Sequence, residues 1–357
     1  MHISGYTCIL ISLLCFGKQS TAQPNVRTHP SIILYDSASN SPNMLNIREE
    51  SPANTMVGIL CIEDLNRYDN EKLTCTTDSN MASLNLLPID GEPSLQFYEI
   101  ATTRVIDREE YLTFDLRITC SDNGSPSLNS SMLVTVNVLD INDNSPTFPR
   151  VKYEFDIFED IAPESVVSTV NAVDHDDGEN GRIEYGFIPD VVSGMFGINP
   201  NSGEIKTKVG FDRELEDTYL LLVIARDKGV PRRTGTALVQ VNIKDVNDNI
   251  PQFTRPNFDF NITGDIESVT TVAQLTAYDK DLNTAPLVYA LVQVYGDNSS
   301  FPFAVLSDGT IVTTTNINLD EATVFSFRVS VSDSGDTLSL SSYTMVNIKY
   351  KPGGISE

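Results

Sequence analysis

The sequence predicts an all-β protein made of tandem immunoglobulin-like, Greek-key β-sandwiches in a linear array. Two observations support this prediction: a repeat of 105 residues and the alternation of apolar and polar side chains within each repeat. Several short strands in a module of about this length are typical of an immunoglobulin-like sandwich. Repeats that lead directly into one another are expected to contact only their neighbours.

The repeat is defined by three sets of short motifs. Val136-Asn137-Val138-Leu139-Asp140 recurs at 241–245 and again at 346–350, in steps of 105 residues. Asp107-Arg108-Glu109 recurs at 212–214, and the turn at 122–126 recurs at 227–231, both at the same step. Three markers with one period indicate a repeated domain. We therefore expect a signal segment at 1–22, repeats at 23–144, 145–249 and 250–350, and a tail at 351–357.

The local pattern within the repeats favours strands. Residues 133–139 and 237–244 alternate apolar and polar side chains, as half-buried strands do. Residues 220–224 form a continuous apolar run, which is consistent with a core strand. Clusters of Gly, Asn, Asp and Pro at 177–181 and 199–203 mark turns. No amphipathic helix is expected beyond the signal segment.

Composition and charge limit the classes of function that the chain could have. The chain has 357 residues, of which 40% are apolar, so a globular protein is expected. Its 49 acidic and 24 basic side chains give a formal charge of −25. A surface of this sign repels nucleic acid and anionic lipid, and it favours the collection of cations.

The beginning of the chain predicts export. Ile9 to Phe16 form a short apolar core, and Ser20-Thr21-Ala22 resembles a cleavage site. No later run of about 20 apolar residues predicts a membrane span. We expect an extracellular protein, either secreted or located at the cell surface as the front part of a longer membrane protein.

Cysteines and sequons agree with an oxidising compartment. Cys61, Cys75 and Cys120 follow the signal segment, and two of them could pair, although the sequence does not select the pair. Alternatively, all three are small apolar core residues. Sequons for glycosylation occur at Asn123, Asn129, Asn261 and Asn298.

Acidic and amide residues crowd the boundaries between repeats. The first boundary reads Asp-Ile-Asn-Asp-Asn-Ser-Pro at 140–146, and the second reads Asp-Val-Asn-Asp-Asn-Ile-Pro at 245–251. In an extended segment, side chains alternate sides. Asp140, Asn142 and Asn144 would then point one way and Asp143 another, so one linker could offer oxygens to cations on both sides. The alternative is that these residues only form turns and solvated surface.

Paired carboxylates elsewhere indicate calcium. Asp107 and Glu109 are two residues apart, and so are Asp174 and Asp176, which places each pair on one face of an extended segment. Gathered carboxylates are unfavourable without a cation. Calcium accepts six to eight oxygens including amides and carbonyls, whereas magnesium requires a stricter octahedron and zinc prefers His or Cys.

These motifs together resemble the cadherin superfamily. An early Glu, an Asp-Arg-Glu, an Asp-x-Asn-Asp-Asn linker, an Asp-x-Asp and an Ala-x-Asp-x-Gly stand in order across residues 44–335. The resemblance implies cadherin-type sandwiches with about three calcium ions at each of two junctions. Because each junction has eight carboxylates, three divalent ions would reduce its charge from −8 to −2.

The resemblance also implies two ligand sets. The first junction would use Glu49, Asp107, Glu109, Asp140, Asn142, Asp143, Asp174, Asp176 and Asp227, with main-chain oxygens of Ile141, Asn144 and Asn180. The second would use Glu159, Asp212, Glu214, Asp245, Asn247, Asp248, Asp279, Asp281 and Asp333, with main-chain oxygens of Val246 and Asn249.

The third repeat departs from the pattern. Asp320-Glu321-Ala322 stands where Asp-Arg-Glu is expected, Tyr350 where the linker Asp is expected, and Thr263-Gly264 where the early Glu is expected. We therefore expect no calcium junction after this repeat. The chain has no Trp, which excludes adhesive arms that exchange a Trp. The first repeat is more similar to a protocadherin module, in which Glu63-Asp64-Leu65 replaces Asp-x-Asp.

These observations predict calcium-dependent cell–cell adhesion through a calcium-stiffened rod. The expected partner is an identical cadherin-like chain on an apposed cell, with neither nucleic acid nor a small-molecule substrate. An alternative is a secreted cadherin-like binding module or decoy. A metal-dependent hydrolase is disfavoured because no nucleophile motif or recurring general base lies near the acidic clusters.

Overall fold

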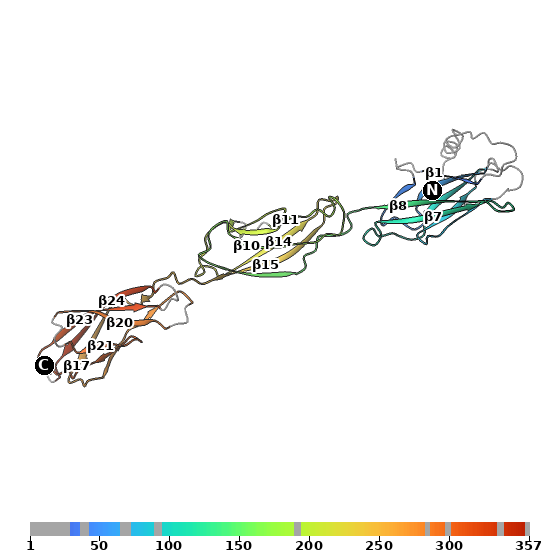
Figure 1. The fold of residues 1–357 in the computed structure, drawn as a ribbon. Helices are drawn as coiled ribbons and strands as arrows, with labels where there is room; N and C mark the ends of the chain where they lie inside the picture. Colours follow the sequence, from blue (N-terminus) through green and yellow to red (C-terminus); the bar gives the residue numbers. More distant parts are fainter. Residues whose placement is uncertain are drawn as a thin grey trace. The chain divides into compact units, whose positions relative to one another are not determined.

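The computed structural model describes residues 29–35, 43–64, 73–88, 95–188, 194–282, 286–296, 301–333 and 339–353. The expected signal segment at 1–22, Leu65 and the sequon Asn298 lie outside these residues. Within them, the named elements are all β-strands, which confirms the predicted all-β class (Figure 1). A search of these residues finds no helix with the length and apolar character needed to span a membrane.

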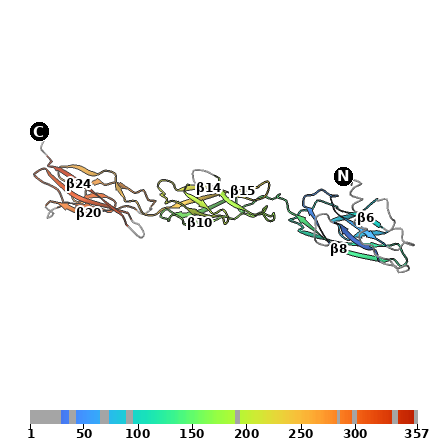
Figure 2. The ribbon, with the colours of Figure 1, turned by 90° about the horizontal axis from the view of Figure 1, so that it is seen from above.

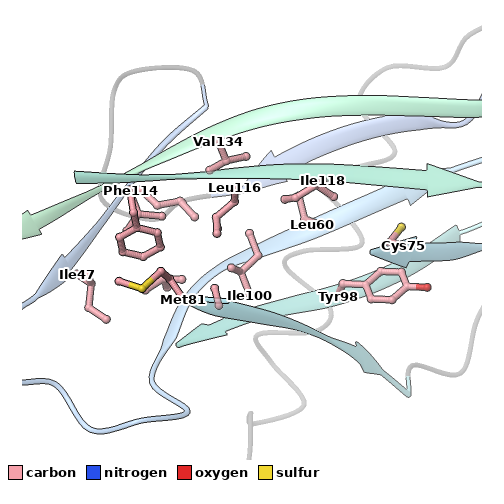
Figure 3. Close-up of a cluster of buried hydrophobic side chains, with 14 of the residues drawn as sticks. Ile47, Leu60, Cys75, Met81, Tyr98, Ile100, Phe114, Leu116, Ile118 and Val134 are labelled. Carbon is pink, nitrogen blue, oxygen red and sulfur yellow. The ribbon is translucent and has the colours of Figure 1, made fainter. Parts of the chain in front are cut away.

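The first sandwich packs two four-stranded sheets, with orders β1-β3-β6-β5 and β2-β8-β7-β4. Its strands are β1 Ser31–Tyr35, β2 Met44–Arg48, β3 Met56–Glu63, β4 Thr74–Thr77, β5 Ala82–Leu87, β6 Leu95–Thr102, β7 Thr113–Ser121 and β8 Asn129–Leu139. Leu60 on β3, Ile100 on β6, and Leu116 and Ile118 on β7 are buried between the sheets (Figure 3). Leu116 and Ile118 are two residues apart, so the apolar side chains of this strand point to the core with the two-residue period of a strand.

The second sandwich pairs a sheet of order β10-β13-β12 with one of order β11-β14-β15-β9. Its strands are β9 Lys152–Phe158, β10 Val166–Thr169, β11 Glu184–Phe187, β12 Phe196–Ile198, β13 Glu204–Thr207, β14 Thr218–Arg226 and β15 Thr234–Lys244. Phe196, Ile205, Val223 and Val241 are buried in its core.

The third sandwich uses sheets of order β18-β22-β21 and β17-β24-β23-β20, with a short β16-β19 pair. Its strands are β16 Gln252–Phe253, β17 Asn257–Thr263, β18 Thr271–Gln274, β19 Ala277–Tyr278, β20 Val288–Tyr295, β21 Phe303–Val305, β22 Thr310–Thr313, β23 Thr323–Ser332 and β24 Ser341–Lys351. Each sandwich uses strands from one continuous stretch of the sequence, as the colour blocks of Figure 2 show.

One parallel pairing recurs in all three sandwiches and fixes the position of the acidic motifs. β2 pairs with β8, β9 with β15, and β17 with β24, each in parallel. The two paired strands therefore end side by side. The early Glu and the acidic linker follow these ends in the first two sandwiches, so the pairing places them next to each other.

The register of the third sandwich corrects the sequence alignment. Phe155 pairs with Val241, and its counterpart Phe260 pairs with Ile348. By this register, Tyr350 occupies the place of the core residue Ile243, and Pro352 occupies the place of Asp245. The alignment of Tyr350 with the linker Asp is therefore wrong by two residues. Because side chains alternate, a shift of two residues keeps the same face inward.

A disulfide bond settles the pairing that the sequence left open. Cys75 and Cys120 lie opposite each other on β4 and β7 and are joined. Cys61 lies on β3 and is buried. The fold thus brings together two cysteines that are 45 residues apart in the sequence.

The chain divides into two compact units. One comprises residues 1–147, 172–184 and 225–235, and the other comprises 148–171, 185–224 and 236–357. The loops of the second sandwich that face the first linker thus belong to the first unit. As a result, each acidic boundary lies wholly within one unit.

Candidate metal centres

The first centre collects acidic residues from strand ends of the first sandwich and from loops of the second. Glu49 directly follows β2, and residues 140–144 directly follow β8. Carboxylate oxygens of Glu49, Asp107 and Glu109 lie within 4.8 Å of one another, and the same holds for Glu109, Asp143 and Asp176. The two groups share Glu109, so the acids of both sandwiches form one cluster.

The second centre repeats this arrangement in the other unit. Carboxylate oxygens of Glu159, Glu214 and Asp248 lie within 4.8 Å of one another, as do those of Glu214, Asp245 and Asp281. Glu214 belongs to both groups, as Glu109 does in the first centre. In each centre, the structure therefore brings together acids that the sequence assigned to the same ligand set.

The early Glu of each centre is fixed by backbone groups. Glu49 is 2% exposed, and its carboxylate accepts hydrogen bonds from the amides of Arg108 at 2.9 Å and Ile141 at 2.7 Å. Glu159 accepts the equivalent bonds from Arg213 at 2.7 Å and Val246 at 2.8 Å. Each Glu thereby connects the Asp-Arg-Glu turn to the linker, which orients all three motifs.

Amide side chains of the linkers reach the next sandwich. Asn142 donates to the Asp227 carboxylate at 3.2 Å, and Asn144 donates to Asp176 at 2.8 Å. In the second centre, Asn249 donates to Asp281 at 2.8 Å, and Asn247 donates to Asp333 at 3.3 Å. These bonds hold acids of the following sandwich beside the linker.

Burial, together with neighbouring carboxylates, raises the pKa of several carboxyl groups. Burial, hydrogen bonding to Asp107 and the charge of Glu49 raise the pKa of Glu109 to about 7. Burial and the charges of Glu49 and Asp176 raise the pKa of Asp143 to about 6. Burial is also the main cause of the raised pKa values of further members: Asp174, Glu214, Asp248 and Asp279. A nearby divalent cation would offset this cost of ionisation.

The oxygens that remain available fit a calcium ion. Within the described part of the chain, Asn142 Oδ1, Asp174 Oδ2 and Asp279 Oδ2 are buried and have no hydrogen-bond donor. A buried oxygen without a donor is costly, so these three atoms need a partner. All are carboxylate or amide oxygens, which are the ligands that calcium prefers. The residues present therefore fit the ion that the sequence implies.

One predicted ligand, Asp227, also stabilises a turn. Asp227 is fully buried, and its carboxylate accepts from the amides of Gly229 at 3.0 Å and Arg233 at 2.8 Å. Asp122 makes the equivalent bonds in the first sandwich, where no preceding centre exists in the described residues. Asp227 thus contributes to the fold whether or not it contacts a metal.

The linker acids Asp140 and Asp245 form ion pairs with arginines for which the sequence motifs predicted no role. Arg108 lies 3.2 Å from Asp140 and 3.4 Å from Asp177 of the second sandwich. Arg213 donates to Asp245 at 2.6 Å, and a second nitrogen lies 2.8 Å from Glu214. The Arg within each Asp-Arg-Glu motif could have indicated these ion pairs from the sequence. Each Arg offsets part of the negative charge of its centre and also contacts the next loop.

Asn180 and Gly229 shape the first centre. Asn180 was expected to offer a main-chain oxygen, and its side chain donates to Asp140 at 2.7 Å. A Cβ atom at Gly229 would lie 2.5 Å from the Asn142 side chain and 2.6 Å from Asn180 Oδ1. Because this is closer than atoms approach in proteins, a larger residue at this position would displace these two side chains.

The fold and these clusters define a class: tandem β-sandwiches with oxygen-rich acidic clusters at their boundaries. A model of the cadherin domain matches residues 44–139 and 153–244, which is just over half of the chain. The chain therefore belongs to the cadherin family, and it is protocadherin-like.

Similar proteins agree with this assignment. The chain is 30% identical to human Protocadherin-1 over 294 residues, covering 82% of this chain and 28% of that protein. It is 35% identical to Protein dachsous of Drosophila melanogaster over 234 residues, covering 65% of this chain and 7% of that protein. The chain thus spans less than a third of these relatives.

Solved structures show the same fold. A structure titled Protocadherin gammaB7 EC3-6 cis-dimer has a TM-score of 0.76 at 26% identity, covering 90% of this chain and 77% of that chain. Mouse Cadherin-23 EC22-24 has a TM-score of 0.69 at 27% identity, covering 91% and 99%. Both similarities extend over the region of the third sandwich, which the family model does not match.

Proposed function

We propose that this chain mediates calcium-dependent cell–cell adhesion at the cell surface by binding an identical chain on an apposed cell. It has no catalytic role in this proposal, and about three calcium ions occupy each centre. The single observation that carries the proposal is that each centre combines acids of two consecutive sandwiches with the linker between them. The family relatives support an adhesive role.

In the proposed mechanism, side chains of the protein hold the turn, the linker and the acids of the next sandwich in place. Glu49 and Glu159 hold the turn and linker together, while the linker amides hold the acids of the next sandwich. Bound calcium supplies the positive charge that lets these carboxylates ionise side by side. The free energy of metal binding then favours the arrangement in which both sandwiches contribute ligands. Sandwiches that are held in a fixed arrangement lose less conformational entropy when they form weak contacts between cells.

Limited proteolysis tests the calcium dependence. We expect millimolar calcium to protect residues 140–144 and 245–249 from cleavage and chelation to remove that protection. Asp143→Ala should abolish protection at the first linker only, and Asp248→Ala at the second only. Asp115→Ala is the matched control because this exposed acid bonds Thr135 on the sheet surface, away from both centres. Equal cleavage of the wild-type protein with and without calcium would refute the calcium mechanism.

A second experiment tests adhesion itself. Beads coated with the mature chain should aggregate in calcium and disperse when calcium is chelated. Mixing beads that carry this chain with beads that carry an unrelated cadherin tests whether binding is to an identical chain. Beads that stay dispersed in calcium would contradict the adhesive function without bearing on calcium binding.

A further inference from the structure

The third sandwich carries a glycosylation sequon on an edge strand. Asn261-Ile262-Thr263 lies on β17, which stands at one end of the sheet order β17-β24-β23-β20. Because side chains alternate along a strand, Asn261 and Thr263 point to the same side, and both are exposed. The fold thus leaves at the surface the two groups that define the sequon, the Asn amide and the Thr hydroxyl.

The other sequons in the described part of the chain are placed differently. Asn129 lies on β8, which stands between β2 and β7 in its sheet, and His29 lies 2.9 Å from its carbonyl oxygen. Asn123 lies in the turn between β7 and β8. Of these three positions, Asn261 is therefore the one on an edge strand.

The side chain of Asn261 lacks the partner that its equivalent has in the second sandwich. There, Asp156 on β9 accepts a hydrogen bond from Asn242 at 2.8 Å. By strand register, Asn261 takes the place of Asp156, and Lys349 takes the place of Asn242. The Lys349 ammonium lies 3.7 Å from Asp259 instead. Within the described residues, the Asn261 amide has no hydrogen-bond partner, so its nitrogen is free to carry a sugar.

The edge formed by β17 also carries fewer charges than the equivalent edge of the second sandwich. β9 exposes three charged side chains at alternate positions, Lys152, Glu154 and Asp156. By strand register, the equivalent positions of β17 hold Asn257, Asp259 and Asn261. Unpaired backbone groups at a sheet edge can pair with another chain, and charged side chains are a common protection against this. With one charge in place of three, β17 has less of this protection than β9.

We propose that Asn261 carries an N-linked glycan and that this glycan protects the edge of β17 from pairing with other chains. An oligosaccharide linked to a lipid through a diphosphate supplies the sugar. Asn261 Nδ2 forms a bond to the anomeric carbon, the bond from that carbon to the diphosphate oxygen breaks, and the amide releases one proton as the lipid diphosphate leaves. The inference rests on the cell-surface location in the proposed function, because this transfer takes place during export.

The place of Asn261 on the strand suits this role. It is the fifth of the seven residues of β17, so a glycan attached there lies beside most of the exposed edge. An attached glycan is bulky and strongly hydrated. It therefore blocks the approach of another strand where the charged side chains of β9 have no counterpart.

Mass spectrometry of the full chain secreted by mammalian cells tests the modification. Peptide-N-glycosidase in heavy-oxygen water converts each glycosylated Asn into a labelled Asp. We expect the label at Asn261, its loss in Thr263→Ala, and its retention in Thr263→Ser, which keeps the sequon. Thr263 is exposed, so both variants should fold, and unchanged thermal unfolding would confirm this. An unlabelled Asn261 in the secreted wild-type chain would overturn the proposal.

Light scattering of the same proteins in millimolar calcium tests the protective role. We expect Thr263→Ala to form insoluble material about threefold faster than the wild type, because its edge strand can pair with other chains. Thr263→Ser should behave as the wild type. Adding Asn257→Lys to Thr263→Ala gives β17 the charge that β9 has in Lys152, and it should restore the wild-type rate without a glycan. Equal rates for the wild type and Thr263→Ala would overturn the protective role.

The outcomes separate this modification from the adhesive function. If Asn261 of the secreted chain is unmodified but coated beads aggregate in calcium, adhesion stands and the inference fails. If Asn261 carries the glycan and the beads stay dispersed in calcium, the modification stands and the adhesive function fails.

Discussion

The second and third sandwiches end with the same backbone hydrogen bond between their paired strands, but with different side chains at that position. At the end of the second, the Glu159 amide donates to Lys244 O, and the Glu159 carboxylate accepts from the Arg213 amide at 2.7 Å. At the end of the third, the Gly264 amide makes the equivalent bond to Lys351 O. Glycine has no carboxylate, so another group must bind the turn amide.

Tyr350 provides that group. It is 2% exposed, and its hydroxyl accepts a hydrogen bond from the Leu319 amide at 3.3 Å. By these equivalent hydrogen bonds, Leu319 corresponds to Arg213, and Asn318 and Asp320 correspond to the acids on either side of it. The alignment of Asp320-Glu321-Ala322 with Asp-Arg-Glu is therefore wrong by two residues. A neutral hydroxyl thus replaces a buried carboxylate. The closing hydrogen bond is therefore part of the fold, whereas the negative charge occurs where an acidic cluster follows the sandwich.

Removing the buried carboxylate of the second sandwich should have the largest effect. Glu159→Ala leaves the amides of Arg213 and Val246 without their acceptor, which costs about 1–3 kcal/mol for each group that stays buried. It also removes a proposed ligand from the second centre. We expect calorimetry to show the loss of calcium uptake there and thermal unfolding to show lower stability even without calcium.

Glu49→Ala is the control for that substitution, since it should produce the same two effects at the first centre and spare the second. If Glu159→Ala reduced calcium uptake but left the stability of the calcium-free protein unchanged, the assignment of a fold role to this carboxylate would be wrong.

A second substitution tests the close packing of the first centre. Gly229→Ala places a Cβ atom against the Asn142 side chain, which must move away from the loop. We expect calcium affinity at the first centre to fall about tenfold, which corresponds to about 1.4 kcal/mol, with the second centre unaffected. Gly210→Ala is a suitable control because no atom lies within 4 Å of a Cβ there. Equal titration curves for both variants would contradict the steric argument.

The pH dependence follows from the raised pKa values. In the metal-free protein, Glu109 with a pKa of about 7 and Asp143 with about 6 favour the folded state at low pH, and this contribution is lost as the pH rises through these values. Calcium must displace the bound protons, so its affinity should fall as the pH drops.

We expect binding at pH 5.5 to be at least about tenfold weaker than at pH 7.5, as measured by calcium titration in buffers of constant ionic strength. In Glu109→Gln the pH dependence of the first centre should be smaller. A calcium affinity that is constant between these pH values would show that the carboxylates are already ionised without metal.

The acidic motifs of the two centres could be recognised in the sequence because they are local. Asp107 and Glu109, or Asp174 and Asp176, keep their spacing in any strand register. The structure brings carboxylates of each predicted ligand set within 4.8 Å of one another, and their role as ligands stays a prediction. The third repeat was misaligned because Val346-Asn347-Ile348-Lys349 imitates Val241-Asn242-Ile243-Lys244, while the parallel pairing with β17 shifts it by two residues. An alternating pattern cannot detect such a shift. Likewise, Cys75 and Cys120 became neighbours only through the pairing of β4 with β7.

The smallest expected effect is at Tyr350. Tyr350→Phe keeps the buried ring and removes only the hydroxyl that accepts from Leu319, so the free energy of unfolding should fall by about 0.5–1.5 kcal/mol. Because no carboxylate is involved, the loss should be the same with calcium and with chelator, unlike that of Glu159→Ala. Thermal unfolding of both variants in the two conditions measures this difference. A calcium-dependent effect of Tyr350→Phe would mean that the end of the third sandwich contributes to a metal site, and the distinction drawn between the two ends would fail.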